Sequence, residues 1–267
     1  MIENTSLKIR PTFFNKKSVK KIFRFASENS FNIWIVGGAI RDHFIKKKVK
    51  DIDFAFDIEP IKLLNLLKNS NLKVGIDHIN YGTLSLTLNK NLYYLTSLRE
   101  DVETNGRHAK VRFTNKLRLD SERRDLTINA LYLNSQNELI DFYNGVEDIK
   151  NCSLKFIGNI NKRFLEDNLR ILRYCRFCSL FEKPRLPVDH VVSLKTNSQL
   201  IKNIPKKKLI LEFHKIFENK FYQNSLSMIK YVDLEHYFKN DLGLKKYFYN
   251  NLNKKLLRIS NNYFTFE

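Results

Sequence analysis

The spacing of apolar residues changes along the chain, and each spacing predicts a different kind of element. Apolar residues three and four positions apart predict helices over residues 17–29, 39–46 and 61–68. Strict alternation, or a short run rich in β-branched and aromatic residues, predicts strands over residues 32–36, 52–56, 83–88 and 92–98. Because Asn89, Lys90 and Asn91 separate the last two strands, we expect those strands to form a hairpin.

The second half of the chain has a simpler pattern. Residues 99–121 are polar and irregular, and within them residues 99–110 predict a mobile loop. From residue 153 onward strand signals largely vanish, and helical spacing returns over residues 163–181, 206–217 and 225–238. The pattern predicts an α+β domain over residues 1–150 and an all-α region over residues 151–267.

Composition and charge narrow the class of protein. Apolar residues make up 43% of the 267 residues, and only 8 Gly and 5 Pro interrupt the chain, which favours long helices. The net charge of +19 favours a polyanionic partner, because clustered cations release counterions from a phosphate backbone. The alternative is a Lys- and Asn-rich codon usage without functional meaning.

The sequence carries no sign of a disulfide framework or a membrane segment. Of its three cysteines, Cys175 and Cys178 lie in an apolar helical stretch, which favours buried thiols over a zinc site. The N-terminus has no apolar signal region, and no window approaches the roughly 18 apolar residues of a membrane span. We therefore expect a cytoplasmic protein.

Two aspartates form the first candidate site. Asp51 and Asp53 occupy positions i and i+2 of a predicted strand, so both carboxylates lie on the same face. Two neighbouring negative charges repel each other unless a cation lies between them, and Mg²⁺ prefers carboxylate oxygens. The pair predicts a magnesium site for phosphoryl chemistry. The alternative is a polar edge of a strand.

A glycine pair precedes these aspartates. Gly37 and Gly38 lie where a predicted strand gives way to a helix, and their backbone can approach a ligand closely because neither residue has a Cβ atom. Arg41 would add a charged donor to a bound phosphate. Alone, the pair is an ordinary tight turn; followed by the two aspartates, it indicates a triphosphate site.

The sequence here resembles a known family. VGGAIRD and KDIDFAF are similar to the signature of class II CCA-adding enzymes and bacterial poly(A) polymerases, which belong to the polymerase-β-like nucleotidyltransferases. The resemblance continues in order through LREDVETNGRHAKVRFT, SERRDLTINALYL, LIDFYNGVEDIKN and GNINKRFLEDNLRILRYCRF, and so covers residues 32–181. It implies an α+β head with a small mixed sheet, followed by an all-α neck and a shortened body.

The stretch EDNLRILRYCR predicts a base-reading helix. Asp167 and Arg170 are i,i+3 neighbours on the predicted helix, so an acceptor and a donor lie side by side. This pair matches the edges of cytosine and adenine, whereas uracil and guanine present the reverse order. The resemblance assigns Asp167 and Arg170 this role, and it implies that Arg173 and Arg176 bind nucleotide too. An exposed salt bridge, or an Arg176 paired with a structural carboxylate, is the alternative.

The resemblance implies roles for residues in other motifs. It puts Arg124 at the nucleotide phosphates, while Asp125 and Asn129 contact the ribose or hold the site together, unless Asp125 is a helix cap. Residues Asp141, Glu147 and Asp148 are expected to organise the domain junction. The loop over residues 99–110, which includes Arg107 and His108, corresponds to the family's flexible loop and favours A addition.

Three departures from the family pattern remain. Tyr94 stands where an acidic residue is common, and Lys207 replaces another, although Glu212 is retained. The chain also ends earlier than the family's body and tail helices. The sequence thus predicts a Mg²⁺-dependent enzyme that adds C and A to the tRNA 3′ end from CTP and ATP. The alternatives are a poly(A) polymerase, an A-only or CC-only enzyme, and a non-catalytic RNA-binding relative; the oligomeric state is left open.

Overall fold

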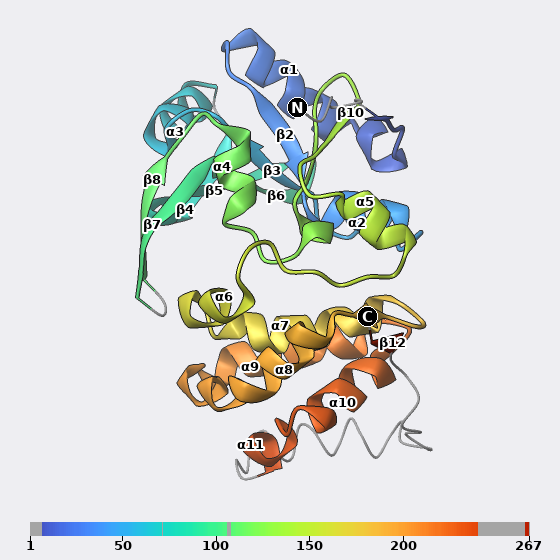
Figure 1. The fold of residues 1–267 in the computed structure, drawn as a ribbon. Helices are drawn as coiled ribbons and strands as arrows, with labels where there is room; N and C mark the ends of the chain where they lie inside the picture. The colour runs from blue at the N-terminus through green and yellow to red at the C-terminus, as the bar shows by residue number, and fades with distance from the viewer. Residues whose placement is uncertain (1–6, 71, 106–107, 240–264, 267) are drawn as a thin grey trace. The chain divides into compact units, whose positions relative to one another are not determined.

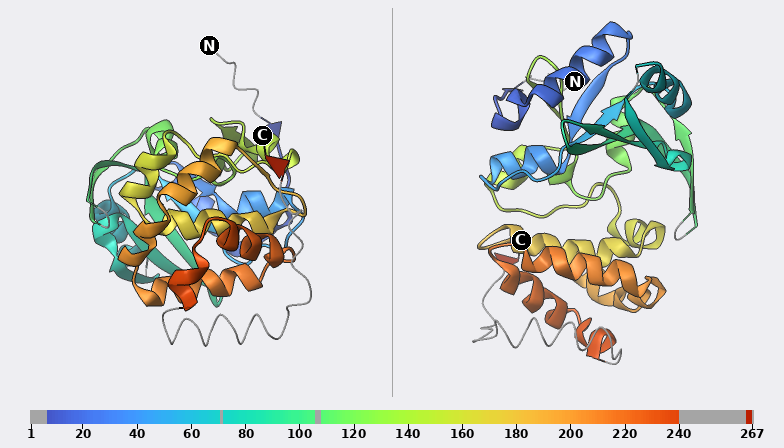
Figure 2. Two further views of the ribbon diagram at one scale, coloured as in Figure 1. Left: turned by 60° about the horizontal axis from the view of Figure 1, so that its bottom comes forward. Right: turned by 180° about the vertical axis from the view of Figure 1, so that it is seen from behind.

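The computed structural model describes residues 7–70, 72–105, 108–239 and 265–266. It divides into two compact units: Met1–Thr104 with Ala109–Ile149, called here the head unit, and Asn105–His108 with Lys150–Glu267, called the helical unit. Figures 1 and 2 show a sheet with covering helices in the first and a group of packed helices in the second. The predicted α+β class, with a mixed sheet followed by an all-α region, is confirmed.

The head unit is built on an eight-stranded sheet in the order β1-β10-β9-β2-β3-β6-β5-β4. Its strands are β1 (Leu7–Lys8), β2 (Ile33–Val36), β3 (Asp53–Phe56), β4 (Lys73–His78), β5 (Thr83–Leu88), β6 (Asn91–Ser97), β9 (Leu131–Leu133) and β10 (Glu138–Asp141). The sheet is mixed, because β3 and β6 are parallel whereas the other neighbours are antiparallel. The predicted β5–β6 hairpin is confirmed, and both turn residues, Asn89 and Lys90, have positive φ, as a tight two-residue turn requires.

Three helices of the head unit, α1 (Lys17–Glu28), α2 (Gly38–Phe44) and α3 (Pro60–Asn69), form where the apolar spacing predicts them. Two short helices, α4 (Leu117–Glu122) and α5 (Gly145–Lys150), were not predicted. Helix α1 packs on one face of the sheet, where Phe23 meets Phe54 edge to face with ring centroids 5.8 Å apart. Successive strand residues point to opposite faces, so Asp53, next to Phe54, lies on the other face. The face of β3 that carries Asp53 is therefore the one opposite α1, and it is the face on which a functional site can form.

The predicted mobile loop is instead a hairpin of strands β7 (Arg99–Asn105) and β8 (His108–Phe113). Charged residues hid the alternation in the sequence, yet the ion pair from Arg112 Nε to Glu100 Oε1, at 2.6 Å, joins the two strands. Arg107 lies outside the described residues. The role of this segment in A addition stays a prediction.

The helical unit contains α6 (Ile160–Glu166), α7 (Leu169–Phe177), α8 (Val188–Thr196), α9 (Lys206–Phe217), α10 (Tyr222–Tyr231), α11 (Glu235–Lys239) and a short pair of strands, β11 (Arg185–Leu186) and β12 (Thr265–Phe266). The single helix predicted over residues 225–238 is wrong. Asp233 adopts φ 57° between α10 and α11, and Leu234 N–H returns to Ile229 O, which ends the helix. Cys175 and Cys178 are buried thiols, as expected.

Candidate active site

The first part of the site is the turn between β2 and α2. Gly37 adopts φ 65°, a left-handed conformation that favours glycine. A Cβ atom there would lie 3.3 Å from Asn129 O and 3.4 Å from Arg124 Nη1. The missing side chain therefore lets the Arg124 guanidinium lie directly against the turn.

The two aspartates lie beside this turn, because Asp53 pairs with Val36, the last residue of β2. Asp51 and Asp53 are exposed while Ile52 between them is 2% exposed, an alternation that agrees with the predicted common face, although Asp51 itself precedes β3. The predicted strand over residues 52–56 begins one residue later, at Asp53, because β2 ends at Val36 and Asp51 has no strand opposite it.

The electrostatics of Asp53 match those of a cation site. Surrounding protein atoms raise the pKa of its carboxyl although the residue is exposed, and the charge of Asp51 raises it further, while Arg124 lowers it. The described residues contain no group of three or more His, Cys, Asp or Glu side chains that would enclose a metal. Two carboxylates suit a divalent ion that completes its coordination with phosphate oxygens and water.

Tyr94 occupies the register position opposite Asp53 on the parallel strand β6. Its side chain is 41% exposed and lies on the same face as Asp53, since paired residues of neighbouring strands share a face. The position that commonly carries an acid in the resembling family is therefore next to the aspartate pair in space.

Arg41 is fixed by a buried polar chain. Its Nη1 donates to Asn129 Oδ1 at 2.6 Å, and Asn129 Nδ2 donates to Asp125 Oδ1 at 3.0 Å. Its Nε and Nη2 both donate to Asp42 Oδ1. The predicted helix start at Asp125 is a 3₁₀ turn over Thr127–Asn129, which Asp125 does not cap. The holding role expected of Asp125 and Asn129 agrees with these contacts.

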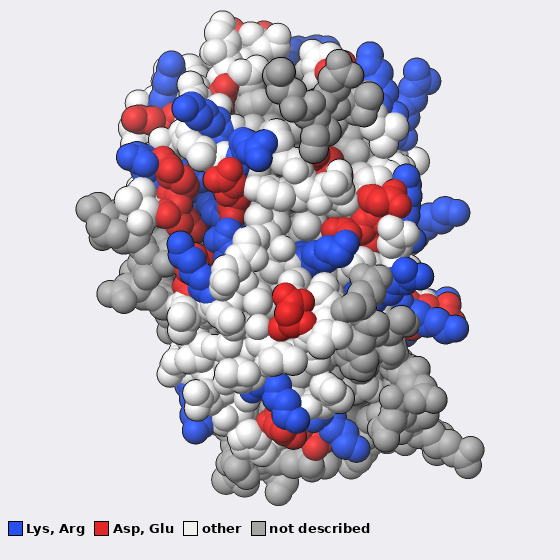
Figure 3. All heavy atoms as spheres, in the orientation of Figure 1, with Lys and Arg blue, Asp and Glu red and all other residues white. Residues whose placement is uncertain are grey.

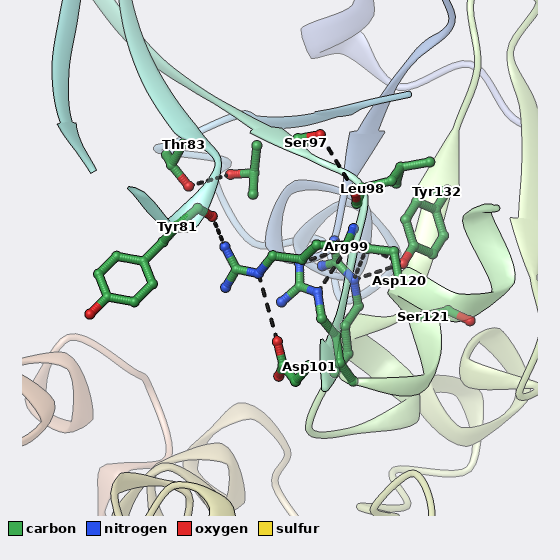
Figure 4. Close-up of polar contacts among 12 residues, drawn as sticks. Tyr81, Thr83, Ser97, Leu98, Arg99, Asp101, Asp120, Ser121 and Tyr132 are labelled. Atoms are coloured by element: carbon green, nitrogen blue, oxygen red, sulfur yellow. Dashed lines mark hydrogen bonds and ion pairs between the residues drawn. The ribbon is translucent and has the colours of Figure 1, made fainter. Parts of the chain in front are cut away.

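Asp120 is the centre of a second network, in which Figure 4 shows it near Tyr132, and Arg124 belongs to the same network. Its side chain is 1% exposed, and Oδ1 accepts from Arg123 Nη2 at 2.7 Å. Oδ2 accepts from Arg124 Nη2 at 3.0 Å and from the Tyr132 hydroxyl at 2.8 Å. The Arg124 guanidinium also lies over the Tyr132 ring, with 4.9 Å from Cζ to the centroid. These contacts hold the arginine in one orientation.

Charge compensation keeps this cluster ionised. Burial alone would raise the pKa of Asp120, but Arg123 and Arg124 hold it well below its usual range. Burial alone would lower the pKa of Arg124, but Tyr132 and Asp120 raise it. For Arg99, whose backbone N–H donates to Asp120 Oδ1 and whose Nη1 donates to Tyr81 O, burial and Arg123 lower the pKa to about 10.

Asp120 and Tyr132 were not among the residues singled out from the sequence. One local signal pointed to Asp120: in LDSERRD it stands three and four residues before Arg123 and Arg124, the spacing of ion pairs on one helix face. No local signal marks Tyr132, because its strand β9 lies beyond the turn that carries Asp125. Only the fold brings it back to Asp120.

In the helical unit the chain breaks where one helix was predicted. Asp167 is extended, with φ −150° and ψ 103°, and its Oδ1 accepts from Leu169 N–H at 3.1 Å. The carboxylate thus bonds to the backbone ahead of α7 and does not continue α6. The helix predicted over residues 163–181 is two helices, and Asp167 precedes the one that carries Arg170, Arg173 and Arg176.

Two of the arginines of α7 contact glutamates. Arg170 Nη1 donates to Glu166 Oε2 at 2.7 Å and is 9% exposed. Arg176 Nε donates to Glu212 Oε2 at 2.6 Å, which is the structural pairing that the sequence left open. Burial alone would raise the pKa of Glu212, but Arg176, Arg173 and Lys215 lower it. Glu166, which lies outside the predicted set, therefore helps to place Arg170.

The turn at the end of the head unit is structural, in agreement with the sequence. Asp141 accepts hydrogen bonds from the backbone N–H groups of Tyr143, Gly145 and Val146. Thr127 donates to Asp148 at 2.7 Å, which ties α5 to the turn that carries Asn129. Within the described ranges, every helix is too short or too polar to span a bilayer.

Comparison with known proteins shows what this chain is similar to. The Poly A polymerase head domain matches residues 33–155. The human mitochondrial CCA tRNA nucleotidyltransferase 1 is 35% identical over 223 residues, which cover 80% of this chain and 50% of that protein. The CCA-adding enzyme of Enterococcus faecalis is 31% identical over 202 residues, covering 75% and 48%. The chain thus spans about half the length of these curated relatives.

Solved structures share the fold. The Bacillus stearothermophilus CCA-adding enzyme in complex with CTP aligns with a TM-score of 0.72 at 24% identity, over 83% of this chain and 52% of that one. A tRNA nucleotidyltransferase complexed with a primer tRNA and an incoming ATP analog aligns with a TM-score of 0.65 at 28% identity, over 80% and 61%. The likeness extends beyond the head domain, since both alignments cover more of the chain than residues 33–155.

Proposed function

We propose that the chain belongs to the family of CCA-adding enzymes and poly(A) polymerases, which its matched head domain and its relatives support, and that it adds C and A to the 3′ end of tRNA from CTP and ATP without a nucleic-acid template. The observation that carries the proposal is the meeting of three features at one end of β2 and β3. The aspartate pair, the glycine turn and Arg124 all lie there.

Asp51 and Asp53 would hold Mg²⁺ in this reaction. When bound, the metal supplies positive charge to the reacting phosphate and to the leaving pyrophosphate. Surrounding protein atoms raise the pKa of Asp53 and the charge of Asp51 raises it further; a bound cation would offset both, which supports the assignment.

The arginines of the head unit would bind the triphosphate. Arg41 and Arg124 both border the turn formed by Gly37 and Gly38, and their guanidinium groups are already oriented by Asn129 and Asp120. In the proposed reaction the RNA 3′-hydroxyl oxygen bonds to the α-phosphorus, the bond to the bridging oxygen breaks, and pyrophosphate leaves. The hydroxyl proton passes to solvent. Oriented cations serve this step because they need no rearrangement as charge develops.

Base selection would come from the helical unit. Asp167 would accept from the exocyclic amino group of cytosine or adenine, while Arg170 would donate to the adjacent ring nitrogen. Uracil and guanine would leave both groups mismatched, a cost of about 1–3 kcal/mol for each buried group. Arg173 and Arg176 would add positive charge, with Arg176 acting mainly through its pairing with Glu212. The cytoplasmic location predicted from the sequence remains part of the proposal, although the human relative is named as mitochondrial.

A poly(A) polymerase is the second candidate, favoured by the description of the matched head domain. The discriminating experiment offers the purified chain three tRNAs, ending before CCA, after the first C and after the second C, with Mg²⁺ and labelled CTP or ATP. The proposal predicts products that stop at CCA. Long A tails would support the poly(A) polymerase, A addition to the third tRNA alone would indicate an A-only enzyme, and binding without incorporation would indicate a non-catalytic relative.

A further inference from the structure

A basic pocket lies in the head unit at the end of α2. Its volume is about 580 Å³, and it is formed by the segment before α1 and by the loop that joins α2 to Asp51. The lining residues are Thr12, Phe13, Lys16, His43, Lys46, Lys47, Lys48 and Val49. Four of these eight are lysines and none is acidic, so no carboxylate within the lining compensates their charge.

The pocket has a fixed frame. Phe13 is 4% exposed and meets the His43 ring edge to face, with centroids 6.3 Å apart. The loop after α2 is held by backbone bonds, from Lys46 N–H to His43 O at 3.1 Å and from Lys47 N–H to Asp42 O at 2.8 Å. The exposed lysines thus stand on a loop of defined course, on which Lys46 takes the left-handed conformation with φ 55°.

Net charge alone does not locate a binding surface on this protein. On the face shown in Figure 3, lysines and arginines lie next to aspartates and glutamates, so the two signs are interspersed there. The pocket differs because four of its eight lining residues are lysines and none of the eight is acidic.

We propose that this pocket binds backbone phosphates of the RNA substrate, close to its 3′ end. The inference rests on the proposed function, and it adds a contact that neither the aspartate pair nor the base-reading helix supplies. Lysine ammonium groups are compact charges that suit phosphate oxygens at varied angles, and the volume exceeds what one phosphate requires.

The position along the chain supports an RNA backbone as the occupant. Lys48 precedes Asp51 by three residues, so their Cα atoms are at most about 11 Å apart. A strand whose 3′-hydroxyl lies at the aspartates would therefore place its preceding phosphates within reach of Lys46 and Lys48. The nucleotide triphosphate is a poorer occupant, because Arg41 and Arg124 already border the glycine turn.

The test compares two charge reversals in the full-length chain. Lys46→Glu with Lys48→Glu changes the pocket, whereas Lys62→Glu with Lys68→Glu changes two exposed lysines of α3 by the same charge. We expect the pocket pair to weaken tRNA binding at least tenfold at low salt and to reduce the slope of log Kd against log salt by about 2. The control pair should weaken binding less than threefold. Equal losses in the two pairs would overturn the proposal.

The binding is measured without nucleotide, so the result does not depend on catalysis. If the wild-type chain adds no nucleotide yet the pocket pair selectively loses tRNA, the pocket proposal stands while the proposed reaction fails. Affinity for CTP and ATP should be the same in both pairs, and a selective loss of CTP affinity in the pocket pair would make the pocket a triphosphate site and overturn the RNA assignment. Equal unfolding midpoints show that both variants fold.

Discussion

In the head unit, Arg124 contacts the Asp120 carboxylate, the Tyr132 hydroxyl and ring, and the backbone oxygen of Asn129. In the helical unit, Arg170 contacts the Glu166 carboxylate and the backbone oxygen of Arg163. The first arginine is held in a 1%-exposed carboxylate network, whereas the second meets a glutamate whose side chain is 11% exposed. The two arginines are therefore held by carboxylates that differ in burial.

This difference matches the two tasks proposed for the units. A triphosphate presents the same charge whichever base it carries, so a rigid cation serves every nucleotide. A base edge differs between cytosine and adenine, so the residues that read it must accept two shapes. Substitutions in the Asp120 network of the head unit, called here the head network, should therefore change stability and triphosphate binding. Substitutions in the arginine–glutamate pairs of the helical unit, called the helical pairs, should change nucleotide choice.

The largest effect should come from Asp120→Asn. The substitution leaves Arg123 and Arg124 without their buried counter-charge, and breaking a buried pair in this way costs about 3–5 kcal/mol. Urea unfolding measures the loss. Glu59→Ala removes the same charge from an exposed position that caps no helix end with its side chain, and it should change stability by less than about 0.5 kcal/mol. Similar losses in both variants would show that the head network does not depend on the Asp120 charge.

Glu212→Gln should have the next largest effect. Glu212 is 3% exposed and accepts from Arg176 and Lys215, and hydrogen bonds to charged groups contribute about 1.5–3 kcal/mol. We expect a loss of about 2 kcal/mol in urea unfolding, smaller than that of Asp120→Asn because Lys215, one of the two cations on Glu212, is exposed, whereas Arg123 and Arg124 are largely buried around Asp120. A larger loss than that of Asp120→Asn would show that the contacts of Glu212 contribute more to stability than the Asp120 network does.

Glu166→Gln tests the link between the helical pairs and nucleotide choice. It removes the charge that orients Arg170, so discrimination between CTP and UTP should fall about tenfold, or about 1.4 kcal/mol. Competition assays with both nucleotides measure the ratio. Asp120→Asn should instead weaken all triphosphates alike. Unchanged discrimination between CTP and UTP in Glu166→Gln would show that Glu166 does not contribute to base selection.

The smallest expected effect is on folding stability at acidic pH. Because the folded pKa of Asp120 is depressed, its stabilising contribution is complete above its unfolded pKa of about 3.9 and is lost as the pH falls. The loss from this one group should reach about 0.4 kcal/mol at pH 4 and about 1 kcal/mol at pH 3. Stability measured between pH 6 and pH 3 should therefore fall less steeply in Asp120→Asn than in the wild type. Equal slopes would mean that Asp120 does not titrate with folding.

The sequence predicts elements best where one face is clearly apolar. Helices α1, α3 and α9 follow from spacing alone, and so does the β5–β6 hairpin. The β7–β8 hairpin was missed because charged side chains occupy its strands, so burial does not mark its alternation. The break before α7 was missed because the hydrogen bond from Leu169 N–H to the Asp167 carboxylate leaves no trace in periodicity.

In the candidate site, too, some features follow from the local sequence and others do not. Sequence spacing and the family resemblance were enough to predict that Asp51, Asp53 and the glycine turn lie close together, since β2 and β3 are neighbouring strands. The contacts of Arg124 with Tyr132, and of Arg176 with Glu212, join residues that only tertiary packing brings together. Local sequence therefore identifies the groups that would touch substrate better than the groups that hold them.

The central claim is that the aspartate pair drives nucleotide addition, and Asp53→Asn tests it most directly. The substitution keeps the shape of the side chain and removes its charge at an exposed position, so folding and tRNA binding should persist. Single-turnover addition of labelled CMP to tRNA that lacks CCA should fall at least about a thousandfold, or about 4 kcal/mol in the barrier. Addition that stays within tenfold of the wild-type rate would contradict the account.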